Sequence, residues 1–153
     1  MLLTPNFTLS EFTASDTARR RGIDNTPSAA VIANLTLLCR NLLQPFRDLV
    51  GRPLIVNSGY RCPALNAAVG GVKNSQHLTG QAADIHLPRL PLTRPDGTTA
   101  SQSPATLGRQ WIQRITAARL PFDQIILEHN ARGSYWLHLS YSPTRNRRQI
   151  IDR

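Results

Sequence analysis

Two segments far apart in the chain carry the residues that most constrain its fold. Ser75–Asp84 contains a histidine followed by an aspartate, and Trp136–His138 ends on a second histidine. Two imidazoles and one carboxylate suit a single divalent zinc ion, which binds both kinds of ligand at about 2.0 to 2.2 Å. If His77, Asp84 and His138 bind one ion, the fold must bring the two segments together.

The proposed ligand set also indicates a kind of chemistry. A zinc ion with only three protein ligands keeps a fourth position for water. Zinc lowers the pKa of that water toward about 7 and polarises a carbonyl group beside it. The pattern therefore favours a hydrolytic centre, and amide hydrolysis is a natural outcome.

Length and composition limit the class of protein. At 153 residues with 41% apolar side chains, the chain fits one compact domain, 1–153. Residues 1–6 lack the basic start and apolar run of a signal peptide, so we expect a cytoplasmic protein at synthesis without membrane insertion. Cys39 and Cys62 are too few for a disulfide framework, and neither indicates a zinc thiolate site.

Basic residues outnumber acidic ones by eighteen to nine, which gives a net charge of +9. Such a charge attracts anionic polymers, including nucleic acid, cell-wall polymers and acidic membrane surfaces. The clusters Arg19–Arg21 and Arg145–Arg148 contain no interleaved aromatic residues for stacking on bases. We therefore predict that 143–153 is a solvated basic tail and that there is no dedicated nucleic-acid site.

Helix signals occur in the first third of the chain. Thr8–Glu11 has the capping-box form and predicts a short helix to about residue 18, within an N-terminal docking segment, 1–25. Thr26 as cap and Pro27 in the first turn then open a long core helix that ends at Gly51. Its apolar stripe is Val31, Leu35, Leu38, Leu42, Phe46 and Leu49. Pro45 lies inside and should kink this helix or end its regular part early.

The remaining chain alternates predicted strands with shorter helices. Strands are expected at 54–58, 82–87, 122–128 and 135–141, the last two joined by a turn at 130–133, and helices at 63–69 and 104–118. Residues 88–103 are rich in Pro, Thr, Ser and Gly and predict a long surface loop. The fold class is α+β, a mainly antiparallel sheet flanked by helices. In a regular strand His86 shares a face with Asp84, where we expect it either to support a metal ligand or to line the pocket wall.

Several short motifs together resemble one known family. They are Ser58–Arg61, Asn66, Val69–Gly71, Ser75–His77, Gly80, Ala82, Asp84–Ile85 and Trp136–Ser140. The combined pattern resembles the zinc D-Ala-D-Ala carboxypeptidase family of peptidoglycan peptidases, which shares its core fold with the Hedgehog signalling domain and lysostaphin-type enzymes. The opening, 6–12 and 22–27, is similar to single-domain members found in phages and prophages.

The resemblance implies roles for individual residues. His77, Asp84 and His138 match the three Zn2+ ligands of the family. Arg61 matches an arginine placed over the substrate carbonyl, where a fixed cation stabilises the developing oxyanion. Ser75 matches a serine that either binds the substrate backbone or caps the local turn.

The general base departs from the better-known family pattern. Many members carry an acidic residue three positions before the last histidine, but Tyr135 stands there. Glu128 is the expected substitute, because antiparallel pairing returns it close to His138. Asp123 and His129 are weaker candidates, and Tyr135 is an alternative source of a pocket hydroxyl.

These observations predict a monomeric zinc peptidase acting on bacterial peptidoglycan, a phage or prophage lysin that reaches the wall after release or delivery. The bond cleaved stays open between D-Ala-D-Ala carboxypeptidase and endopeptidase activity, and we expect 88–103 to hold the residues that decide it. One alternative is a non-catalytic, zinc-stabilised module that binds cell wall or protein. A third is a basic virion or nucleic-acid-associated protein.

Overall fold

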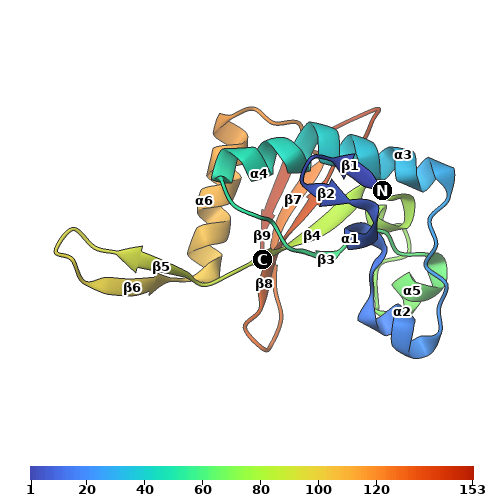
Figure 1. Ribbon diagram of the computed structural model, residues 1–153, viewed down its shortest axis with the longest axis horizontal. Helices are drawn as coiled ribbons and strands as arrows, with labels where there is room; N and C mark the ends of the chain where they lie inside the picture. The colour runs from blue at the N-terminus through green and yellow to red at the C-terminus, as the bar shows by residue number, and fades with distance from the viewer.

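A five-stranded sheet forms the centre of the computed structural model, which describes residues 1–153 (Figure 1). Neighbouring strands are antiparallel, except that the last strand runs parallel to its neighbour. In spatial order they are β3 (Val56–Ser58), β4 (Ala82–Leu87), β8 (Tyr135–Ser140), β7 (Gln124–His129) and β9 (Gln149–Asp152). The predicted α+β class with a mainly antiparallel sheet is confirmed.

The two faces of this sheet differ because side chains alternate along each strand. Ile85, Leu127 and Leu137 point to one face, where they are fully buried against the helices. The residues between them, including Asp84 and His138, point to the other face. The same alternation that builds the core therefore also places the polar residues of the site.

The long core helix is divided into three parts, α3 (Ala29–Leu38), a π-helical turn η1 (Cys39–Leu43) and α4 (Gln44–Val50). In Figure 1 these three parts form one continuous rod across the upper part of the view. A proline cannot donate to the preceding turn, and its ring crowds the carbonyl four residues earlier. The wider π turn lies directly before Pro45 and lets the helix pass the proline, as such turns do elsewhere.

The start of this helix differs from the sequence prediction. Ser28, not Thr26, is the N-cap, and its hydroxyl accepts a hydrogen bond from the Val31 amide at 3.2 Å. Thr26 instead donates both its backbone and its hydroxyl hydrogen to Asp24. The local turn at Asp24 competes for Thr26, so the second available hydroxyl caps the helix.

Helix α6 (Pro104–Ala117) begins after Ser103, whose hydroxyl caps it as the Ser-Pro pair predicts. Trp111 lies edge-on to Phe46, with ring centroids 5.4 Å apart, so α6 and α4 share one core above the sheet. No helix in the structure combines the length and the apolar character that crossing a membrane requires.

The N-terminal segment contains two helices where the sequence predicted one. Strands β1 (Leu2–Thr4) and β2 (Phe7–Thr8) precede α1 (Leu9–Thr13) and α2 (Asp16–Arg21). The capping box is present, since Glu11 accepts a hydrogen bond from the Thr8 amide at 2.9 Å. Ser15 caps the second helix, and this new start divides the predicted single helix in two. Phe12 is fully buried and anchors this segment to the core.

Residues 88–103 form a β-hairpin where the sequence predicted a loop. Strands β5 (Leu90–Thr93) and β6 (Thr99–Gln102) pair in antiparallel register and project away from the body of the molecule (Figure 1). Asp96 and Gly97 make the turn between them, with Gly97 at φ 85°. Leu90 and Leu92 stand at alternate positions of β5, and the paired Thr93 and Thr99 favour strands, although the Pro and Gly content is typical of loops.

The basic end of the chain also differs from the prediction of a solvated tail. Strand β9 lies at the edge of the central sheet, where Gln149 to Asp152 pair with Gln124 to Leu127. Arg147 binds the carboxylate of Asp123, and the Arg148 guanidinium lies 4.7 Å from the centre of the Phe122 ring. Part of the positive charge is thus used to fix the last strand.

Candidate metal centre

The three predicted ligands come from neighbouring elements on the open face of the sheet. Asp84 on β4 is the direct cross-strand partner of His138 on β8. His77 lies in a short 3-10 helix, η2 (Gln76–Thr79), which precedes β4. Gly80 ends η2 in the left-handed conformation at φ 75°, and an added Cβ would lie 2.8 Å from a backbone oxygen of Val31. Gly80 thus makes a tight reversal between His77 and Asp84.

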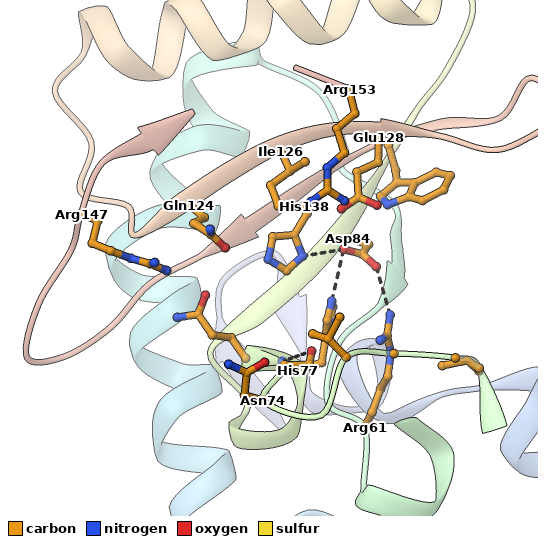
Figure 2. A pocket seen from close by; sticks show the side chains of 17 residues that line it. Arg61, Asn74, His77, Asp84, Gln124, Ile126, Glu128, His138, Arg147 and Arg153 are labelled. Carbon is orange, nitrogen blue, oxygen red and sulfur yellow. Dashed lines mark hydrogen bonds and ion pairs between the residues drawn. The ribbon is translucent and has the colours of Figure 1, made fainter. Parts of the chain in front are cut away.

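The two histidine nitrogens each lie at about the separation from the Asp84 oxygen that ligands of one zinc ion have. His77 Nε2 lies 3.3 Å and His138 Nδ1 lies 3.1 Å from the same oxygen, Oδ1 of Asp84 (Figure 2). The three ligand atoms all lie within 4.8 Å of one another. Tetrahedral coordination at about 2.0 to 2.2 Å places neighbouring ligand atoms roughly 3.3 to 3.6 Å apart. The donor set therefore fits zinc in both chemistry and spacing.

The surrounding backbone fixes which nitrogen of His77 is free. His77 Nδ1 lies 2.6 Å from the carbonyl oxygen of Gly59, which accepts a hydrogen bond when that nitrogen is protonated. This tautomer leaves the Nε2 lone pair directed at the ligand group, as is usual for metal-binding histidines. His77 is also almost fully buried, so its ring orientation is set by packing.

Asp84 is strongly biased toward its ionised form. Burial acts to raise its pKa, but hydrogen bonds from His138 and His77, and the positive charges of these rings in their protonated form, outweigh burial and hold the pKa of this carboxyl well below its ordinary value. A buried carboxylate that stays ionised is suited to binding a cation.

Arg61 is held beside Asp84 by three contacts. Its Nε donates to Ser58 Oγ at 3.0 Å, Nη1 to Asn66 Oδ1 at 3.3 Å, and Nη2 to Asp84 Oδ2 at 3.4 Å. Asn66 lies in α5 (Pro63–Ala68), and a Cβ added at Gly71 would clash with its side-chain oxygen. Gly71 therefore leaves room for the amide that positions the guanidinium.

A cleft of about 550 Å³ lies over the ligand group. Ile126 on β7 is the cross-strand partner of His138, and Glu128 follows two residues later on the same face. Figure 2 shows the Glu128 side chain above Asp84, on the ligand side of the cleft. Strand pairing thus brings Glu128 into the cleft, although it is distant from Asp84 in sequence.

The other residues considered beside Glu128, namely Asp123, His129 and Tyr135, do not line the cleft. Tyr135 pairs with Leu87 and His129, packs against the core, and its ring is stacked on His129 at 5.1 Å. The proposed pocket hydroxyl of Tyr135 is therefore wrong, because odd positions of β8 face the helices. Asp123 is buried and fully engaged by Arg147.

Two other predicted residues have defined local environments. Ser75 lines the cleft, and its hydroxyl accepts a hydrogen bond from the His77 amide at 3.2 Å, so it caps η2. His86 shares the open face with Asp84 as expected, opposite Trp136. It does not line the cleft, and the expectation of a pocket-wall histidine is corrected, since β4 carries it beyond the edge of the depression.

The residues that shape the rest of the cleft were not foreseen. None comes from 88–103, which points away, so the prediction that this segment decides specificity is wrong. The walls include Gln124, Ile126, Arg147 and Arg153. Gln124 and Ile126 follow from Glu128 by the period of a strand, whereas no short-range pattern indicates Arg147 or Arg153.

Comparison with known proteins agrees with this geometry. A family model described as Peptidase M15 matches residues 5–117. The chain belongs to the peptidase M15 family. Membership confirms the predicted family and fold class and places the chain among peptidases.

A curated relative extends the comparison to the metal. The zinc D-Ala-D-Ala carboxypeptidase of Streptomyces albus G is 35% identical over 81 residues, 52% of this chain and 31% of that protein. The match thus spans about a third of the relative's length. Zinc in the name of this M15 relative agrees with the His–Asp–His group, and the predicted zinc cofactor is confirmed.

Proposed function

We propose that this M15 peptidase hydrolyses an amide bond of bacterial peptidoglycan. The observation that carries the proposal is the placement of Glu128, a carboxylate that lines the same cleft as the His77–Asp84–His138 group. A module that used zinc only to stabilise its fold has no need of an acid there. The relative named as a zinc D-Ala-D-Ala carboxypeptidase supports the substrate class.

Five residues of the cleft then have distinct tasks. His77, Asp84 and His138 would hold zinc, which when bound supplies a Lewis acid and makes hydroxide available near neutral pH. Glu128 accepts the proton of the attacking water and delivers it to the nitrogen of the departing amine. Arg61 faces the group from the opposite wall, where its fixed guanidinium stabilises negative charge on the carbonyl oxygen.

The geometry of Arg61 favours this role over a purely structural one. Its guanidinium is fastened by Ser58 and Asn66 on one side and still faces the cleft on the other. A cation held in this way needs no reorganisation as charge develops, which is where most of its contribution arises. Its side chain is only 16% exposed, so water screens the charge weakly.

Release of terminal D-alanine and endopeptidase cleavage both fit a cleft whose wall follows β7 from Gln124 to Glu128. We propose that the protein acts as a phage or prophage lysin, made in the cytoplasm and carried or released to the wall. The net charge of +9 supports this, because it would hold the enzyme on an anionic wall.

The test is digestion of purified peptidoglycan by zinc-loaded wild type and Glu128→Ala, with mass spectrometric identification of the new termini. We expect the variant to bind one zinc and lose cleavage by at least about 100-fold, the usual contribution of a general base. Free D-alanine identifies a carboxypeptidase, and new amino termini on D-Glu or the diamino acid identify an endopeptidase. Equal cleavage by both proteins would refute the assigned base.

A further inference from the structure

Arg147 stands at one end of the cleft and has no task in the mechanism above. It precedes β9 and lines the cleft together with Gln76 and Gln124 (Figure 2). Its Nε and Nη2 each donate to the Asp123 carboxylate at 2.9 Å, and its backbone amide donates to the same group. The side chain is thereby fixed by a residue that lies beneath the cleft.

The arrangement presents the positive end of this ion pair to the cleft. Asp123 is only 4% exposed, whereas the Arg147 side chain is 48% exposed. A guanidinium has five N–H donors, and the two bonds from Nε and Nη2 leave three of them free. Both Nη1 hydrogens and one on Nη2 remain, which is the fork that binds a second carboxylate with two parallel bonds.

The strand register gives the distance along the cleft between the metal ligands and the end at which Arg147 lies. Arg147 is bound to Asp123, the residue before Gln124. Gln124 precedes Ile126 by two residues, and Ile126 is the cross-strand partner of His138. Two residues of strand span about 7 Å. A peptide extended along the cleft would advance by about the same distance in two residues.

We propose that Arg147 and Gln124 form a subsite for a carboxylate of the substrate peptide, about two residues from the bond that is cleaved. This inference rests on the proposed function, because it assumes that the substrate is a peptidoglycan stem. Such stems offer two sources of this group, the α-carboxylate of D-Glu and the free carboxylate of the diamino acid. Amidation of either residue removes the charge and leaves the backbone unchanged.

The experiment measures peptide binding without cleavage. Zinc-loaded Glu128→Ala is titrated calorimetrically with three stem peptides: one with both carboxylates free, one amidated at D-Glu and one amidated at the diamino acid. We expect one of the amidations to weaken binding by about 10-fold or more, the usual effect of losing a charge-assisted pair. The amidation that does so identifies the carboxylate.

Variants in the same background assign the effect to Arg147. Arg147→Gln should bind the free and amidated peptides within about two-fold of each other, and Arg147→Lys, which keeps the charge without the fork, should show an intermediate preference. Arg145→Gln is the matched control, because Arg145 is exposed, carries the same charge and does not line the cleft. It should keep the full preference.

Two results would overturn the subsite: equal binding of all three peptides before Arg147 is changed, or a preference that survives in Arg147→Gln. If that variant does not fold, as judged by circular dichroism and zinc content, the peptide comparison and Arg147→Lys decide the matter. Failure of the proposed function is seen separately, as a lack of cleavage by zinc-loaded wild type. The binding comparison does not depend on that outcome.

Discussion

Replacing Asp123 with asparagine should lower the stability of the protein in a way that depends on pH. Hydrogen bonds from the Arg147 side chain lower the pKa of Asp123 most; burial opposes them, and the Arg147 amide and Gln76 add to the lowering, so that the pKa falls to about 2. The ordinary value is 3.8. A difference of nearly two pH units corresponds to about 2 kcal/mol, and screening of the half-exposed arginine reduces this to about 1–2 kcal/mol.

The sign follows from the direction of the pKa change. A carboxyl whose pKa is lowered by folding contributes its full stability above the unfolded value, and that contribution disappears as the pH falls from about 4 through 2. Urea unfolding of the metal-free wild type and Asp123→Asn should therefore differ by about 1–2 kcal/mol at pH 7 and by less at pH 3. Metal-free protein is used so that loss of zinc at low pH does not enter. A difference that is absent at pH 7, or constant with pH, would show that the ionised Asp123 does not stabilise the folded protein through Arg147.

Three further outcomes are expected. Gly71→Ala should keep zinc but reduce turnover, because the new Cβ displaces Asn66 and the guanidinium it holds; unchanged turnover would contradict this. Phe46→Ala should destabilise the protein by about 3–5 kcal/mol in urea unfolding, since this ring is fully buried, and a loss below about 1 kcal/mol would disagree. A thiol reagent should modify Cys62 in the native protein and Cys39 only after unfolding, because burial raises the pKa of the Cys39 thiol and hides it.

Much of the fold follows from local rules. Period two in 82–87 correctly places Asp84 on the face opposite Ile85, and the same rule extended along β7 places Glu128 on the cleft face. The capping box at Thr8 and the cap at Ser103 are short-range hydrogen bonds that residue type nearly determines.

The sequence predictions fail where contacts between distant segments, or competing local hydrogen bonds, determine the structure. Strand β9 is held by parallel pairing with β7 and by the Asp123–Arg147 pair, partners 24 residues apart that no local pattern connects. The sequence does not reveal the hairpin at 88–103, because its Pro and Gly content is typical of loops. The long helix is capped by Ser28 and not by Thr26, because Thr26 donates its hydrogen bonds to Asp24.

The residues of the site also divide into those that local patterns predict and those that depend on tertiary pairing. His77, Asp84 and His138 are grouped as the motif indicated, and strand register accounts for Glu128. Arg147 and Arg153, which flank β9, are seen to line the cleft only once the sheet is assembled. Cleft residues of this kind depend on tertiary pairing, so sequence spacing alone does not reveal them.

We propose that the peptidase activity of this protein depends on one zinc ion held by His77, Asp84 and His138. The direct measurement is a titration of zinc into metal-free wild type, with bound metal and peptidoglycan cleavage followed in the same samples. We predict that cleavage rises with bound zinc and reaches its plateau at one ion per chain, and that His138→Ala shows neither tight binding nor cleavage. Cleavage by the metal-free protein, or stoichiometric zinc binding without any cleavage, would contradict the claim.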